Sequence, residues 1–227
     1  MEAFVDVILP RGVLFDLDGT LLDHRGAADA AVREWAVRIL GVSLDAVDAV
    51  ERWRLLEERY FAMFERRECT FQEQRRSRVR AFAPVLAALE DEAADELFVG
   101  YQELYRCSWR AVVGAAEIVS RAFAAGCCVG VLTNGDESQQ RDKLAAIGLL
   151  VPGLRLFASS ATGCAKPDLR AFERACSGLG TSPRETVMIG DDYAKDIAPA
   201  RAAGLRAFQL TEGVTLGEIA DDLFGAA

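Results

Sequence analysis

The sequence predicts an α/β protein whose doubly wound parallel sheet is interrupted once by an all-helical insert. An apolar strand occupies residues 12–16, and from Gly114 onward helices alternate with short apolar strands. Between these regions, residues 26–106 have helical periodicity and no convincing strand. Strand–helix alternation is typical of a parallel sheet covered by helices on both faces. We therefore expect a core domain formed by residues 1–22 and 110–227, and an inserted helical domain over residues 23–109.

The insert is expected to contain four helices. An apolar stripe at helical spacing marks the first, through Ala28, Val32, Trp35 and Ile39. The second is expected to start at Ser43 and to carry Val47, Val50, Phe61 and Phe64. The capping-box pattern Thr70-Phe71-Gln72-Glu73 predicts the start of the third. The fourth is marked by Leu97, Tyr101, Leu104 and Tyr105.

The second part of the core is expected to alternate regularly. Strands are predicted over residues 127–132, 154–159, 186–189 and 206–210. Helices are predicted over residues 115–125, 137–147 and 194–203, the last two ended by Gly148 and Gly204. A further helix carries the stripe Leu169, Phe172, Cys176 and Leu179. Ligands of such sheets bind beyond the carboxyl ends of the strands, so polar residues that follow the strands are the candidate site.

The amino-acid composition excludes several classes of protein. The 227 residues are 51% hydrophobic, enough for a substantial core, and the net charge of −9 argues against general nucleic-acid binding. The longest apolar run, residues 122–132, is too short to span a membrane, and no secretory signal is visible. The six cysteines fit neither a zinc site nor a disulfide framework. We expect a cytoplasmic protein with buried free thiols and no nucleic-acid or membrane partner, either a monomer or a homodimer.

The most informative motif, Asp16-Leu17-Asp18-Gly19-Thr20, follows the first strand. Asp16 and Asp18 leave a strand on the same face because strand side chains alternate. Gly19 allows the backbone to turn directly behind them. Two carboxylates held this close are unfavourable unless a cation lies between them. The motif therefore indicates phosphate chemistry with a divalent metal.

Three further polar groups follow later strands: Thr133-Asn134-Gly135, Ala165-Lys166-Pro167-Asp168, and Ile189-Gly190-Asp191-Asp192 with Asp196. Asp136 is a candidate N-cap, which leaves backbone N–H groups near Thr133 to bind an anion. Pro167 keeps Lys166 extended, so that one of only three lysines lies at a loop rim. Each group is common alone, but their order and shared position at strand ends indicate one site.

With these residues in this order, the chain resembles the haloacid dehalogenase-like hydrolase superfamily. The four motifs of that superfamily correspond to Asp16–Thr20, Thr133, Lys166, and Gly190-Asp191 with Asp196. The resemblance implies a Rossmann-like core with the insert as a type-one helical cap domain. Gln140, Lys143-Leu144 and Gly148-Leu149 are similar to the phosphatase branch that contains acylneuraminate-phosphate phosphatases and pyrimidine nucleotidases.

The resemblance implies a Mg²⁺-dependent phosphatase that hydrolyses a small phosphorylated metabolite. Asp16 would attack phosphorus to form an aspartyl-phosphate, and Asp18 would transfer the protons. The phosphate would be held by Thr133, Asn134 and Lys166. Mg²⁺ would be bound by Asp16, the Asp18 carbonyl and Asp191, with Asp196 close to it as a ligand or through water.

Other chemistries of the superfamily fit the residues less well. Its dehalogenases lack the second aspartate, and its phosphonate hydrolases use a cap lysine, whereas residues 24–110 contain none. Its sugar-phosphate mutases use a cap histidine where Ala28 stands. A phosphoryl-accepting signalling domain would not contain the helical insert. A phosphosugar mutase and a non-catalytic phosphate-binding module on the same fold remain alternatives, and the roles of His24 and Asp192 stay open.

Overall fold

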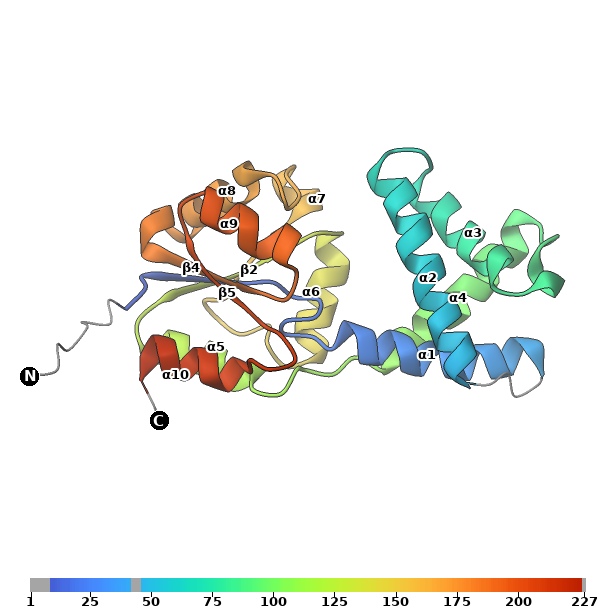
Figure 1. Cartoon of the computed structure of the whole chain (residues 1–227), viewed down its shortest axis with the longest axis horizontal. Coiled ribbons are helices and arrows are strands. Elements are labelled where there is room, and N and C mark those ends of the chain that lie inside the picture. The colour runs from blue at the N-terminus through green and yellow to red at the C-terminus, as the bar shows by residue number, and fades with distance from the viewer. Residues whose placement is uncertain (1–8, 42–45, 226–227) are drawn as a thin grey trace, which may run out of the picture. The chain divides into compact units, whose positions relative to one another are not determined.

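A five-stranded, all-parallel sheet forms the centre of one of the two compact units of the chain (Figure 1). The structure is a computed structural model that describes residues 9–41 and 46–225. The strand order is β3-β2-β1-β4-β5, with β1 in the middle. The strands are β1 (Gly12–Phe15), β2 (Cys128–Thr133), β3 (Arg155–Ala158), β4 (Thr186–Gly190) and β5 (Arg206–Gln209). This topology confirms the predicted doubly wound α/β fold.

Helices cover both faces of this sheet, with α8 and α9 on one side and α5 and α10 on the other (Figure 1). They are α5 (Ala115–Ala124), α6 (Glu137–Ala146), α7 (Ser159–Thr162), α8 (Leu169–Leu179), α9 (Ala198–Ala202) and α10 (Leu216–Phe224), with the 3₁₀ turn η2 (Pro183–Glu185). The helix predicted over 194–203 instead begins as a π-helical turn, η3 (Tyr193–Ile197), before α9. Helices α7 and α10 were not predicted from the sequence, although Thr215 forms a capping box at the start of α10.

The apolar face of α8 packs onto the sheet and fixes its layer. Phe172 and Cys176 are buried together with Leu14 from β1, Leu132 from β2 and Met188 from β4. Burial of such side chains from water is the main driving force for this packing. The predicted stripe is wrong at Leu169, which is 40% exposed because it is the first helical residue and lies at the rim of the packed face.

The second unit, Arg25–Ser108, is entirely helical in its described part. Four helices, the first starting one residue before this unit, and one 3₁₀ turn form it: α1 (His24–Leu40), α2 (Ala46–Glu65), α3 (Phe71–Phe82), η1 (Pro84–Leu86) and α4 (Asp91–Cys107). The predicted capping box is present, because the Glu73 backbone N–H donates to Thr70 Oγ1 over 3.1 Å. The expected helix start at Ser43 and the side chain of Val47 lie outside the described residues.

An aromatic cluster forms the core of this helical unit. The ring centroids of Trp35 and Trp53 are 5.0 Å apart, and those of Trp53 and Tyr101 are 4.6 Å apart. Phe82 packs against both tryptophans. Trp35 also donates a hydrogen bond of 2.8 Å from Nε1 to the Leu97 carbonyl, which ties α1 to α4. The three tryptophans of the chain are buried, so packing accounts for all of them.

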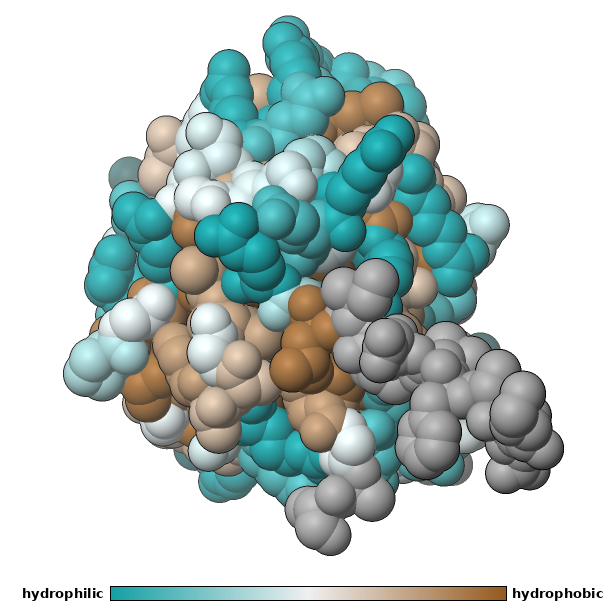
Figure 2. Space-filling model, turned by 90° about the vertical axis from the view of Figure 1, so that its left-hand side faces the viewer, coloured by the Kyte–Doolittle hydropathy of each residue, from teal (hydrophilic) through white to brown (hydrophobic). Residues whose placement is uncertain are grey.

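On the face seen in Figure 2, hydrophobic residues gather mainly in the lower half among hydrophilic neighbours.

All six cysteines are free thiols. The expectation that they are buried holds for Cys127, Cys164 and Cys176 but is wrong for Cys107 and Cys128, which are exposed. Among the described helices, none combines the length and the apolar character that a membrane crossing requires.

We expect Trp35→Ala to lower the free energy of unfolding by about 3–5 kcal/mol, because it leaves a cavity and removes the donor for the Leu97 carbonyl. Urea denaturation followed by circular dichroism measures this change. Leu55→Ala on α2 is the matched control, since Leu55 is 61% exposed and its truncation should change stability by less than about 0.5 kcal/mol. Equal losses in the two variants would contradict the packing role of Trp35.

Candidate active site

The end of β1 is shaped by a turn that only glycine accommodates. The Asp16 backbone N–H donates to the Ile189 carbonyl over 2.8 Å, so pairing with β4 continues up to the first aspartate. The chain then turns at Gly19, where φ is +94°. A Cβ atom on Gly19 would lie 2.3 Å from Asp191 Oδ2. The absence of a side chain at this position therefore lets Asp191 approach the first motif closely.

Three carboxylates meet at this edge of the sheet. Single oxygens of Asp16, Asp191 and Asp196 all lie within 4.8 Å of one another. Asp16 follows β1, Asp191 follows β4, and Asp196 belongs to η3. Asp196 fits only because Gly190 has no side chain, since a Cβ there would lie 2.4 Å from Asp196 Oδ2. The sequence motifs at the ends of two adjacent strands thus form one acidic cluster.

Lys166 contacts this cluster directly. Its Nζ lies 2.5 Å from Asp16 Oδ1 and 2.5 Å from Asp196 Oδ1, and all three side chains are buried. The backbone of Lys166 is held in turn by Asn134, whose Oδ1 accepts from Lys166 N and whose Nδ2 donates to Lys166 O, both over 2.8 Å. This clamp was not predicted from the sequence. It engages both ends of the Asn134 side-chain amide, and the contact of Asn134 with phosphate stays a prediction.

The charges of the cluster do not balance. Burial raises the pKa of Asp16 to about 6, an effect that Lys166 opposes and Asp196 strengthens. Burial also raises the pKa values of Asp191 and Asp196. One ammonium group facing three carboxylates leaves excess negative charge in a partly desolvated site. Oxygen ligands of this kind suit a hard cation such as Mg²⁺, so the residues fit the metal that the family resemblance implies.

Asp18 lies in a different environment. Its carboxylate is 28% exposed and accepts hydrogen bonds of 2.7 and 2.6 Å from Lys143 Nζ. Burial would raise the pKa of Asp18, but Lys143, with smaller contributions from His24 and Gln140, outweighs it and lowers that pKa. The pKa values of Asp16 and Asp18 are therefore shifted in opposite directions.

The remaining predicted residues lie at the same end of the core unit. Thr133, at the end of β2, is buried, and its Oγ1 accepts a hydrogen bond of 3.0 Å from Gln140 Nε2. Asp192, whose role the sequence left open, is the N-cap of η3 and accepts from the backbone of Ala194 and Lys195. Lys143 was not among the predicted site residues. Its rarity, as one of three lysines, is the signal that could have identified it.

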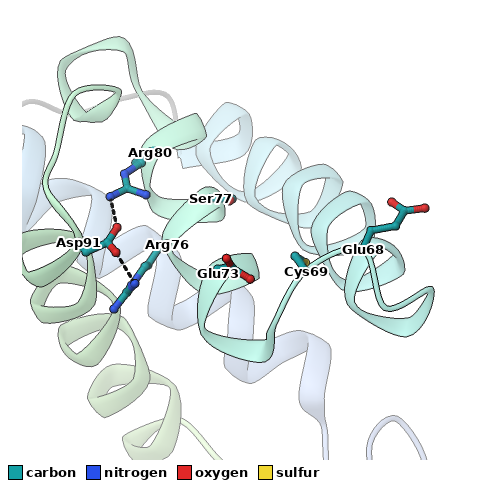
Figure 3. Close-up of a pocket in the computed structure, with 7 residues that line it drawn as sticks. All are labelled: Glu68, Cys69, Glu73, Arg76, Ser77, Arg80 and Asp91. Atoms are coloured by element: carbon teal, nitrogen blue, oxygen red, sulfur yellow. Dashed lines mark hydrogen bonds and ion pairs between the residues drawn. The ribbon is translucent and has the colours of Figure 1, made fainter.

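A separate polar pocket of about 370 Å³ lies within the helical unit (Figure 3). It is lined by Glu68, Cys69, Glu73, Arg76, Ser77, Arg80 and Asp91. Arg76 and Arg80 both form ion pairs with Asp91, as the dashed lines in Figure 3 show. The arginines of this pocket are thus neutralised by acidic neighbours.

Comparison with known proteins agrees with the motifs. The family model of the haloacid dehalogenase-like hydrolases matches residues 10–204. A phosphoserine phosphatase of Thermus thermophilus is 36% identical over 44% of this chain and 40% of its own length. A glyceraldehyde 3-phosphate phosphatase of Methanothermobacter thermautotrophicus is 26% identical over 92% of this chain and 88% of its own length. The (S)-2-haloacid dehalogenase 4A of Burkholderia cepacia is 28% identical over 80% of this chain and 75% of its own length.

Solved structures share the fold. The HAD-hydrolase YfnB from Bacillus subtilis, bound to magnesium, superimposes with a TM-score of 0.74 at 24% identity and covers 92% of both chains. The parallel sheet and the acidic cluster at its edge place the chain in the α/β class, with a site at the carboxyl ends of the strands. The chain belongs to the haloacid dehalogenase-like hydrolase family.

We expect Mg²⁺ to raise the melting temperature of the metal-free protein, because the cation offsets repulsion among the three carboxylates. At 100 times the dissociation constant, the added stability is about 2.7 kcal/mol. The carboxylates of the cluster have raised pKa values, so protons compete with the cation and the shift should shrink from pH 7 to pH 5. Differential scanning fluorimetry with Mg²⁺ or chelator measures both effects.

The matched pair of variants is Asp191→Asn and Asp192→Asn, which remove the same charge at adjacent positions. Asp191→Asn should lose most of the Mg²⁺-dependent shift. Asp192→Asn should keep it, since asparagine also caps helices well. If Asp191→Asn keeps the full shift, the cation binds elsewhere.

Proposed function

We propose that the protein is a Mg²⁺-dependent phosphatase that hydrolyses the phosphate monoester of a small metabolite through an aspartyl-phosphate at Asp16. One observation carries the proposal: Asp16 lies in the metal-type cluster beside Lys166, whereas the carboxylate of Asp18 lies apart from that cluster beside Lys143. A nucleophile and a proton carrier need this separation of environments. The phosphatases among the relatives support the same reaction class.

In the first step, a carboxylate oxygen of Asp16 attacks phosphorus, and the bond to the ester oxygen breaks. Asp18 in its acid form donates a proton to the departing alkoxide. In the second step, Asp18 takes a proton from the water that attacks phosphorus, which releases phosphate and restores the Asp16 carboxylate. The second step therefore returns Asp18 to its acid form, ready to protonate the next leaving group.

Other groups of the site stabilise the transferred phosphoryl group. Lys166 and the Thr133 hydroxyl hold its oxygens. Mg²⁺ would be held by Asp16, Asp191 and the Asp18 carbonyl, with Asp196 as a ligand or in contact through water. When bound, it supplies positive charge that stabilises these oxygens in the transition state.

The presence of Asp18 favours phosphatase over dehalogenase activity, although a dehalogenase is among the relatives. Halide is a stable leaving group that needs no proton, whereas an alkoxide does. A non-catalytic phosphate-binding module is disfavoured because Asp16, Asp18, Lys166 and Asp191 are all present.

We further propose that residues 23–109 act as a cap domain that selects the substrate, and that the protein is cytoplasmic. The named substrates of two relatives, phosphoserine and glyceraldehyde 3-phosphate, are small phosphorylated metabolites. A panel of such compounds, assayed for phosphate release with Mg²⁺ and with chelator, is the direct test of activity and substrate class.

We expect Asp16→Asn to abolish Mg²⁺-dependent phosphate release, because the amide cannot act as the nucleophile. The variant should stay folded, since removing one charge from the cluster relieves repulsion. Asp18→Asn should lower kcat by about 10²–10⁴-fold, the usual contribution of a general acid–base. Steady-state kinetics and melting temperatures measure these effects. Undiminished, metal-independent hydrolysis by Asp16→Asn would falsify the mechanism.

A further inference from the structure

The side chain of Lys143 is buried, which is unusual for a lysine. Only 4% of the residue is exposed, and its Nζ contacts both carboxylate oxygens of Asp18 at 2.7 and 2.6 Å. Lysine is almost never fully buried unless it is paired, because desolvation of the ammonium group is costly. Two contacts from one ammonium group to both oxygens restrict rotation of the Asp18 carboxylate. The pair joins residues 125 positions apart in the sequence.

Gln140 holds the same carboxylate from a second direction. Its Nε2 lies 3.4 Å from Asp18 Oδ2, 3.0 Å from Thr133 Oγ1 and 2.8 Å from the Asn134 carbonyl. Only 3% of Gln140 is exposed, and its Oε1 has no hydrogen-bond partner within the described part of the chain. Buried amides are normally satisfied at both ends. The two N–H hydrogens of Gln140 are shared among three acceptors, and Asp18 is the most distant of them, so Gln140 makes a weaker contact with Asp18 than Lys143 does.

The spacing of Gln140 and Lys143 explains why one helix can bring both side chains to Asp18. Gln140 and Lys143 are three positions apart in α6 and therefore lie on the same face. The helix is anchored directly behind β2 by its N-cap Asp136, which accepts a hydrogen bond from Gln139 N over 3.1 Å. Gly135 makes room for Gln140, since a Cβ there would lie 3.0 Å from Gln140 Nε2. The register of α6 is thus fixed relative to Thr133.

We propose that Gln140 and Lys143 are positioning residues that hold the Asp18 carboxylate beside Thr133, where it meets the ester oxygen of the bound substrate. This assignment rests on the proposed phosphatase function and deepens it. The two residues touch Asp18 and not the reacting atoms, so they act through Asp18. Fixing the proton carrier in advance removes an orientational barrier from the step that expels the alkoxide.

The assignment has a signature that a purely structural role lacks, namely a dependence on the leaving group. An alkyl phosphate expels a strongly basic alkoxide and needs the proton, whereas p-nitrophenyl phosphate expels a stable phenolate and needs it much less. The parameter kcat/KM reports the steps up to release of the alcohol or phenol, before the shared hydrolysis of the aspartyl-phosphate. A misplaced Asp18 should therefore lower kcat/KM selectively for alkyl phosphates.

The experiment compares Lys143→Met, Gln140→Met and Arg141→Met on glycerol phosphate and p-nitrophenyl phosphate. Arg141 is the matched control, an exposed residue on α6 that pairs with Glu137. We expect Lys143→Met to lose at least about tenfold more kcat/KM on glycerol phosphate than on p-nitrophenyl phosphate. Gln140→Met should show the same selectivity to a smaller extent, and Lys143→Arg should restore part of it. Arg141→Met should show none.

A second arm places Lys143→Met in the Asp18→Asn background, where it should add little, because residues acting through one group are not additive. Melting temperatures identify a misfolded variant, in which case Gln140→Met carries the test. Equal losses on both substrates, or full additivity with Asp18→Asn, would overturn the assignment and leave the phosphatase function intact. If the wild-type protein hydrolyses neither substrate, or if its hydrolysis does not depend on Asp16, both the proposed function and this assignment are overturned.

Discussion

Mutual repulsion among three carboxylates at the edge of the sheet is the constraint on which the site depends. Oxygens of Asp16, Asp191 and Asp196 lie within 4.8 Å, with one lysine among them. Such an arrangement is unfavourable without a cation and persists only where the surrounding structure enforces it. Two glycines at the strand ends permit the approach, and the central position of β1 between β2 and β4 brings the motifs together. In this account, the excess negative charge of the cluster is what attracts a cation to this edge of the sheet.

The same edge gives two aspartates, two residues apart, opposite electrostatic surroundings. Burial raises the pKa of Asp16, and it does so beside further carboxylates. Lys143 of α6, with smaller contributions from His24 and Gln140, lowers the pKa of Asp18. Strand geometry alone would place both side chains on one face and treat them alike. The difference is produced by α6, whose register is fixed behind β2 by Asp136. In this account, one helix therefore separates the nucleophile from the proton carrier.

Much of this could be predicted from the sequence where the signals are local. Apolar runs and flanking glycines identified the five strands, and the capping box at Thr70 identified the start of α3. The residues Asp16, Thr133 and Asp191 lie at strand ends as predicted, because parallel strands present their carboxyl ends at one edge. Lys166 does not directly follow its strand, since the short helix α7 lies between β3 and Lys166. Features that depend on tertiary contact were missed. The pair formed by Lys143 and Asp18 and the clamp of Asn134 on Lys166 join distant residues, and nothing local in the sequence indicates either of them. The helix α10 was overlooked despite its capping box, because no further strand follows it to continue the alternation.

The central claim, that Asp16 carries the phosphoryl group, is tested most directly by trapping it. The wild-type protein is mixed with Mg²⁺ and a hydrolysed substrate, quenched in acid during turnover, and reduced with borohydride, which converts an aspartyl-phosphate to homoserine. Peptide mass spectrometry then locates the altered residue. The account predicts homoserine at position 16 and nowhere else, in the presence of substrate only. Turnover without any reduced aspartate, or with the change at another residue, would contradict it.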